Sequence, residues 1–148
     1  MKRNYFLILL FIISILTGCQ PKDEIQELCD TYNNMAPVMI DAQTELLGAV
    51  YTDSFFGFHY KIKGYESDED QDMITQVFLE MELEKQVKQP NAELDLIRKK
   101  GLNLAYQYKD KNDKLCIYVF FSVNQSGEFY LNKELRDRMI EMYKKNNL

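Results

Sequence analysis

The sequence is poor in residues that carry out chemistry. Its 148 residues include one histidine, three cysteines and no tryptophan. His59 falls on the polar side of a predicted strand, and no serine or cysteine stands in a motif that pairs a nucleophile with its base. A solitary histidine is most often an ordinary surface residue. The sequence therefore predicts a protein that is not an enzyme.

Metal-ligand patterns are also absent or incomplete. Asp68, Asp70 and Asp72 resemble the start of a calcium-binding loop. Such a loop needs glycine at its sixth position and glutamate at its twelfth, where this chain has Met73 and Leu79. The carboxylates fit better at the solvated beginning of a helix, whose N-terminus attracts negative charge. We therefore expect neither a bound metal nor a cofactor.

The sequence has no excess of positive charge. Lysine and arginine total 18 against 23 acidic residues, which gives a net charge of −5 at pH 7. Nucleic-acid binding requires a basic surface that neutralises phosphates. The composition therefore argues against a nucleic-acid partner, and against attachment to anionic lipid by charge.

The chain has a single long hydrophobic run, at its beginning. Lys2 and Arg3 precede an apolar stretch over 6–16, and the small residues Thr17 and Gly18 lead to Cys19. A helix of about 11 residues rises about 16 Å, roughly half of a hydrocarbon core, so the run is too short to span a bilayer comfortably. Its layout is that of a signal peptide.

The end of this run resembles the lipobox of bacterial lipoproteins, with Leu16, Thr17 and Gly18 directly before Cys19. In lipoproteins the preceding peptide is removed and the cysteine is acylated, and several acyl chains give stable anchoring. The resemblance implies three segments: a lipoprotein signal peptide over 1–18, the lipidated cysteine with a short tether over 19–22, and one domain over 23–148. An ordinary cleaved signal with an incidental cysteine is the alternative.

The residues after Cys19 bear on location. Gln20, rather than aspartate, follows the cysteine, so in a Gram-negative host we expect the outer membrane, with the domain facing the periplasm. Lys22, Asp23 and Glu24 also resemble surface-export signals of some lipoproteins, which leaves exposure on the cell surface open.

Two cysteines remain once Cys19 is acylated. In an oxidising compartment Cys29 and Cys116 favour a disulfide between the first helix and a central strand. The alternative is two separate buried thiols that behave as small hydrophobic side chains.

Periodicity predicts an α+β domain. Apolar residues recur at helical spacing in three regions, namely 25–35, 73–97 with a break at Pro90, and 131–147. Strand patterns occupy four segments, namely 38–51, 55–65, 102–108 and 115–123. We expect a four-stranded antiparallel sheet built from two hairpins, with N-terminal, middle and C-terminal helices on one face.

The strand segments resemble those of a family of small secreted or lipid-anchored bacterial proteins whose activity is largely unknown. The matching residues are Pro37, Ile40, Asp41, Thr44, Leu46, Phe58, Tyr60, Gly101, Leu104, Tyr106, Tyr108, Asp110 and Leu115. The resemblance covers about 38–123 and implies a fold and a compartment. Asn112 and Asp113 depart from the Asn-Gly turn usual in that family, and the cysteines stand elsewhere than the family tends to place them.

Asp41 and two aromatic residues are further candidates for binding. Asp41 lies among aliphatic residues, where a carboxylate that holds the local turn or receives Thr44 is favoured over a recognition residue. Tyr118 and Phe120 lie on the second face of the central strand, where they form either core or an exposed recognition surface. Either the C-terminal helix or a partner must cover that face.

Together these features predict a non-catalytic, lipid-anchored envelope protein that binds another protein. The acidic residues Asp68, Glu69 and Asp70, or the aromatic pair Tyr118 and Phe120, would form the contact. The alternative is an immunity or inhibitor lipoprotein that neutralises a toxin or secreted effector, for which small size, acidity and a lack of catalytic groups are all expected.

The lipid anchor gives a direct prediction. Replacement of Cys19 by serine removes the thiol that would receive the lipid, so the Cys19→Ser protein should incorporate no labelled palmitate and should remain uncleaved or soluble. Metabolic labelling followed by membrane fractionation measures both effects. Equal labelling of the parent and Cys19→Ser proteins would exclude acylation at this residue.

Overall fold

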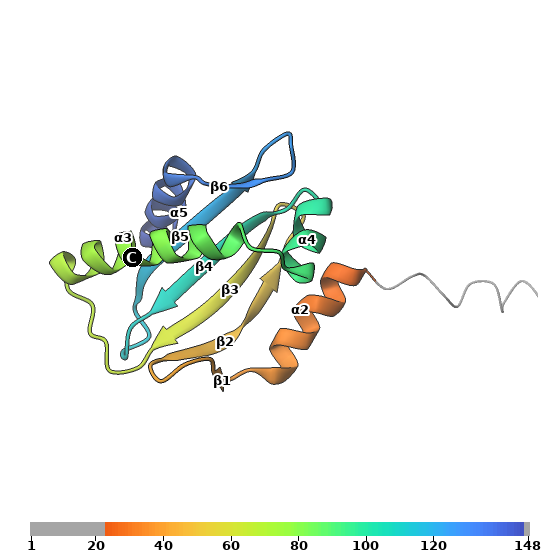
Figure 1. Cartoon of the computed structure of the whole chain (residues 1–148). Coiled ribbons are helices and arrows are strands. Elements are labelled where there is room, and N and C mark those ends of the chain that lie inside the picture. Colours follow the sequence, from red (N-terminus) through yellow and green to blue (C-terminus); the bar gives the residue numbers. More distant parts are fainter. Residues whose placement is uncertain (1–22, 147–148) are drawn as a thin grey trace, which may run out of the picture.

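The computed structural model describes residues 23–146, which form four helices and six strands (Figure 1). In chain order these elements are α2 (Glu24–Met35), β1 (Val38–Met39), β2 (Thr44–Tyr51), β3 (Phe55–Ile62), α3 (Glu69–Val87), α4 (Ala92–Lys99), β4 (Asn103–Lys109), β5 (Leu115–Val123), β6 (Phe129–Leu131) and α5 (Lys133–Asn146). The predicted signal peptide, Cys19 and most of the tether lie outside the described residues.

The strands form one sheet in the order β1-β2-β3-β4-β5-β6. The β3 and β4 strands are parallel, whereas every other neighbouring pair is antiparallel. The expected four-stranded antiparallel sheet is therefore wrong, although both predicted hairpins exist. Helices α3 and α4 carry the chain back across the sheet, so β4 begins at the same end as β3. Strands β1 and β6 contain two and three residues, too few to show an alternating pattern.

The main core lies between the sheet and helices α2, α3 and α4. It contains Ile25 of α2, Val87 of α3 and Ile97 of α4, packed on strand residues such as Phe56 and Phe121. Asp23 caps α2 by accepting a hydrogen bond from the Ile25 N–H at 3.1 Å. The helices from two of the three predicted regions, namely α2 from the first and α3 and α4 from the second, therefore cover one face of the sheet.

The other face of the sheet is covered by α5, contrary to the expectation that all helices share one face. Ala105, Tyr118 and Phe120 form a second core there, packed against Leu135 and Met139 of α5. Tyr118 and Phe120 are only 2% and 3% exposed. They are core residues, and a partner cannot reach them while α5 is in place.

Cys29 and Cys116 are free thiols, so the expected disulfide is absent from the structure. Cys29 lies on α2, which packs over β2, whereas Cys116 lies three strands away on β5. Three strand spacings correspond to about 14 Å, and disulfide geometry requires Cα atoms within about 7 Å. Each thiol has a local partner instead. Asn33 Nδ2 donates to Cys29 Sγ at 3.6 Å, and Cys116 Sγ donates to the Tyr108 carbonyl at 3.2 Å.

Gly48 provides a test of the α2–β2 packing. Its φ of +145° disfavours residues with a side chain, and a Cβ there would lie 2.6 Å from Asn33 Oδ1, which accepts the Ala49 N–H at 2.8 Å. Gly48→Ala should lower the free energy of unfolding by about 2 to 3 kcal/mol, because backbone strain and a lost hydrogen bond add. Gly127→Ala, at φ +79° with nothing within 4 Å, should cost only the strain, about 1 kcal/mol. Urea denaturation measures both, and equal losses would contradict the proposed clash.

Candidate protein-binding surface

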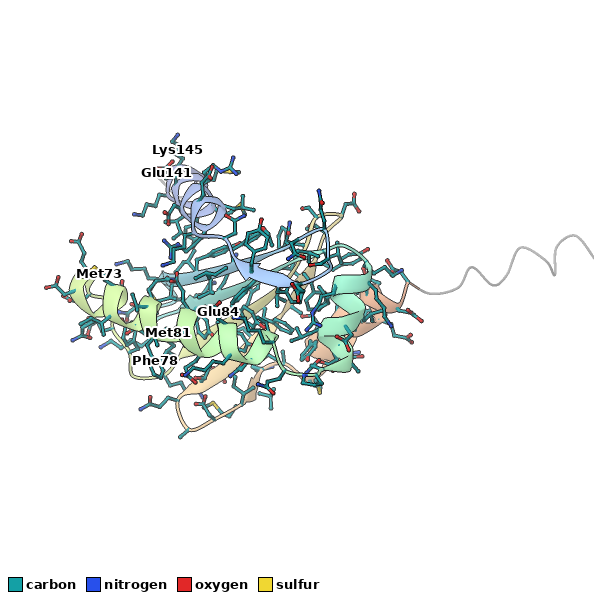
Figure 2. The ribbon with its side chains drawn as sticks, turned by 45° about the horizontal axis from the view of Figure 1, so that its top comes forward. Met73, Phe78, Met81, Glu84, Glu141 and Lys145 are labelled. Atoms are coloured by element: carbon teal, nitrogen blue, oxygen red, sulfur yellow. The ribbon has the colours of Figure 1, made fainter. Side chains whose placement is uncertain are left out.

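The outer side of α3 carries a row of large apolar side chains that nothing in the described structure covers. Five residues make up this α3 row, with exposed fractions between 52% and 69%: Met73, Ile74, Val77, Phe78 and Met81. Figure 2 shows Phe78 and Met81 on the outer side of the helix. An apolar stripe at helical spacing normally packs on a core. Here the stripe faces solvent.

The inner side of α3 explains this orientation. Gln76, Glu80, Leu83 and Val87 recur at intervals of four, three and four residues, and the last three of them are buried. Leu83 and Val87 enter the main core. The helix therefore has two sides with apolar residues, the exposed α3 row and the side with Leu83 and Val87. The second side, which also carries Gln76 and Glu80, packs on the rest of the domain.

Gln76 attaches α3 to an open part of the sheet. Strand β6 pairs only with residues 121–123 of β5, so the preceding part of β5 has β4 on one edge and no strand on its outer edge. Gln76 fills part of this place: its Nε2 donates to the Tyr118 carbonyl at 3.0 Å, and its Oε1 accepts the Tyr118 N–H at 3.2 Å. One side chain thus satisfies both the N–H and the C=O of Tyr118. Left free, these backbone groups could pair with a strand of another chain.

Glu80 connects α3 to α5. The residue is 4% exposed, and its carboxylate accepts a hydrogen bond from Gln76 Nε2 at 2.8 Å. It also pairs with the Arg136 guanidinium and lies 3.6 Å from Lys133 Nζ. Loss of one member of a buried ionic group leaves the others uncompensated. This group therefore resists rotation of α3.

The acidic residues predicted as a contact lie at the beginning of α3. Asp68 is the N-cap and accepts hydrogen bonds from the Asp70 and Gln71 N–H groups at 3.2 and 3.3 Å. The neighbouring Ser67 hydroxyl donates to Asp72 at 2.6 Å. Asp68, Glu69 and Asp70 are all exposed, so the end of the α3 row near Met73 is negatively charged.

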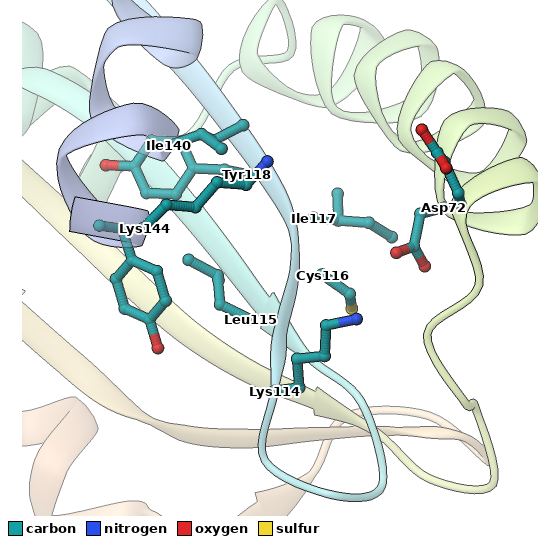
Figure 3. A pocket seen from close by; sticks show the side chains of 10 residues that line it. Asp72, Lys114, Leu115, Cys116, Ile117, Tyr118, Ile140 and Lys144 are labelled. Carbon is teal, nitrogen blue, oxygen red and sulfur yellow. The ribbon is translucent and has the colours of Figure 1, made fainter. Parts of the chain in front are cut away.

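A cavity of about 650 Å³ lies between α3, β5 and α5. Figure 3 shows Asp72 on the α3 side, Ile140 and Lys144 on the α5 side, and Cys116 and Ile117 between them. Burial, followed by the charges of Asp72 and Asp110, raises the pKa of the Cys116 thiol to about 12. The thiol is therefore protonated at neutral pH and is a poor nucleophile.

The remaining candidates do not assemble into a site with Cys116. His59 lies on the α5 side of the sheet, because its neighbours Phe58 and Tyr60 point to the main core. It is half-buried rather than exposed, and burial, followed by the charge of Lys109, lowers its pKa. Cys116 packs against the main core on the other side. Asp41 accepts the Gln43 and Thr44 N–H groups, both at 2.7 Å, and these bonds lower its pKa. The turn-holding interpretation of Asp41 is supported.

Within 23–146, no three His, Cys, Asp or Glu side chains gather as a metal site would require. None of the helices in this part of the chain is both long and apolar enough to cross a membrane.

Comparison with known proteins defines the fold alone. No protein-family model and no curated protein matches the sequence. A crystal structure from Pseudomonas aeruginosa, described as a secreted protein, superposes with a TM-score of 0.55 at 13% identity. The match covers 74% of this chain and 98% of that one. The domain therefore has the fold of a small bacterial protein described as secreted.

The Gln76 contact can be tested by substitution. Gln76→Met keeps the length and helix propensity of the side chain but leaves the Tyr118 N–H and C=O without their partner. We expect the free energy of unfolding to fall by about 2 kcal/mol, the cost of leaving such groups unsatisfied. Gln71→Met is the matched control, because Gln71 lies on the same helix and is exposed. If both variants unfold at the same denaturant concentration as the parent, Gln76 does not hold α3.

Proposed function

We propose that the protein is a lipid-anchored component of the bacterial cell envelope that acts, without catalysis, by binding another protein through the α3 row. The lipobox resemblance at residues 16–19 supports the anchor, and the likeness to a bacterial protein described as secreted supports the compartment. The α3 row supports the binding role.

The exposure of the α3 row is the observation that carries this proposal. Five large apolar side chains stand side by side on two and a half turns of one helix, each more than half exposed. Contiguous apolar patches on a protein surface mark interaction sites, whereas single exposed apolar residues are ordinary. Methionine and phenylalanine are also enriched in the central part of protein interfaces.

The charges around the α3 row favour a protein over a lipid surface. Helices that lie on membranes carry lysine and arginine on the polar side, which attract anionic headgroups. In α3 the first turn carries three acidic residues, Glu69, Asp70 and Asp72. The acidic residues Glu82 and Glu84, later in the helix, are paired with Lys85 and Lys88. The negative charge at the start of α3 repels anionic lipid, so the apolar row suits a protein interface.

Site-specific crosslinking in cells tests the proposal. A photoreactive phenylalanine analogue at position 78 preserves the aromatic character of the α3 row and places the reactive group at its centre. In cells that produce the full chain, illumination should give a discrete protein adduct, which mass spectrometry identifies.

The same analogue at Met35 is the matched control. Met35 is 52% exposed, similar to the 60% of Phe78, but lies at the end of α2. The control should give no discrete adduct. The proposal is wrong if position 78 yields only lipid adducts or none, or if position 35 yields the same protein adduct with equal efficiency.

A further inference from the structure

We infer that the occupant of the α3 row is a second copy of this chain, whose α3 packs antiparallel to the first across a two-fold axis between Val77 and Phe78. This inference rests on the proposed function, because it assigns the partner of the same surface. It follows from the order of residues along the outer side of α3.

Four of the five residues in the α3 row form complementary pairs when one copy is reversed. Successive residues of an α-helix are rotated by 100°, so residues equidistant from the midpoint between 77 and 78 are placed symmetrically about one line on the helix surface. In a reversed copy Val77 therefore meets Phe78, and Ile74 meets Met81. Both pairs consist of exposed apolar side chains. In an isologous contact each pair occurs twice.

The charges at the two ends of the row follow the same symmetry. Asp70 precedes the row in the first turn of α3, and Lys85 follows it in the last turn. In the antiparallel arrangement Asp70 of each copy lies opposite Lys85 of the other, giving two attractive pairs. A parallel arrangement would place Asp70 against Asp70, and like charges are unfavourable across an interface. The antiparallel pairing is therefore the one that charge favours.

Lys85 is available for such a contact. In one chain its Nζ lies 2.7 Å from Glu82 Oε1, with side chains that are 67% and 42% exposed. Exposed pairs of this kind contribute little to stability and exchange readily. Asp70 and Lys85 of the same chain are about 22 Å apart along the helix, beyond the screening length of about 8 Å at physiological salt. Within one chain, a change of charge at Asp70 therefore cannot be compensated by a change of charge at Lys85.

The size of the contact predicts a weak dimer. Five side chains of this type expose roughly 100 Å² each, so two copies would bury about 1,000 Å², the lower end of specific interfaces. Attachment of both copies to one membrane through Cys19 and a short tether would raise their effective concentration and favour such a contact.

Charge reversal at the two ends tests the arrangement. The full lipidated chain is studied in density-matched detergent micelles by sedimentation equilibrium at several protein concentrations. We expect reversible dimers, with Asp70→Lys and Lys85→Glu each raising the dissociation constant about tenfold, because each converts two attractive pairs into two repulsive ones. The variant with both substitutions should have a dissociation constant close to that of the parent protein, because it restores two attractive pairs. All variants carry the same anchor, so sharing of micelles affects them equally.

Recovery of dimerisation in the double variant distinguishes the antiparallel contact from an effect of either substitution within one chain. Any effect of Asp70→Lys on the helix start within one chain cannot be relieved by a change about 22 Å away. A monomer at every concentration, or a double variant that dimerises no better than the single variants, would overturn the inference. The crosslinking at position 78 decides separately whether the α3 row binds a protein of another kind.

Discussion

The orientation of α3 depends on the two hydrogen bonds between Gln76 and the backbone of Tyr118. Strand β5 extends beyond β6, and a free strand edge is a site for uncontrolled pairing. A glutamine on the adjacent helix supplies one donor and one acceptor, as a strand residue would. Together with the ion pair between Glu80 and Arg136 of α5, this contact fixes which side of α3 packs on the rest of the domain. The α3 row is exposed as a consequence.

This exposure leaves a large apolar row in contact with water, which is unfavourable. A helix with two apolar sides could in principle bury either one, and burial of the larger row would remove more apolar surface from water. The structure buries Leu83 and Val87, together with the polar Gln76 and Glu80, and leaves Met73 to Met81 outside. The proposed function requires that something else covers the row in the cell. A protein partner meets that requirement, and the pattern of charge around the row favours a second copy.

Local features of the fold could be predicted from the sequence, and non-local ones could not. Both hairpins and all four helices follow from periodicities of two and 3.6 residues, and the acidic start of α3 from the charge preference of a helix N-terminus. The parallel pairing of β3 with β4 depends on how α3 and α4 cross the sheet. Burial of Tyr118 and Phe120 agrees with the core interpretation and not with the recognition surface. The α3 row was visible in the sequence, but not its exposure, because Gln76 and Glu80 become inward residues only when β5 and Arg136 are beside them.

Oxidation of methionines tests most directly whether the α3 row is covered in the cell. Met73 and Met81 are 63% and 56% exposed, and Met35 and Met142, at 52% and 57%, are references within the same chain. Oxidation follows the access of the reagent to sulfur. In dilute purified protein the four should oxidise at comparable rates, and in intact envelopes Met73 and Met81 should be protected relative to Met35 and Met142. Unchanged relative rates of all four in the envelope would show that nothing binds the α3 row.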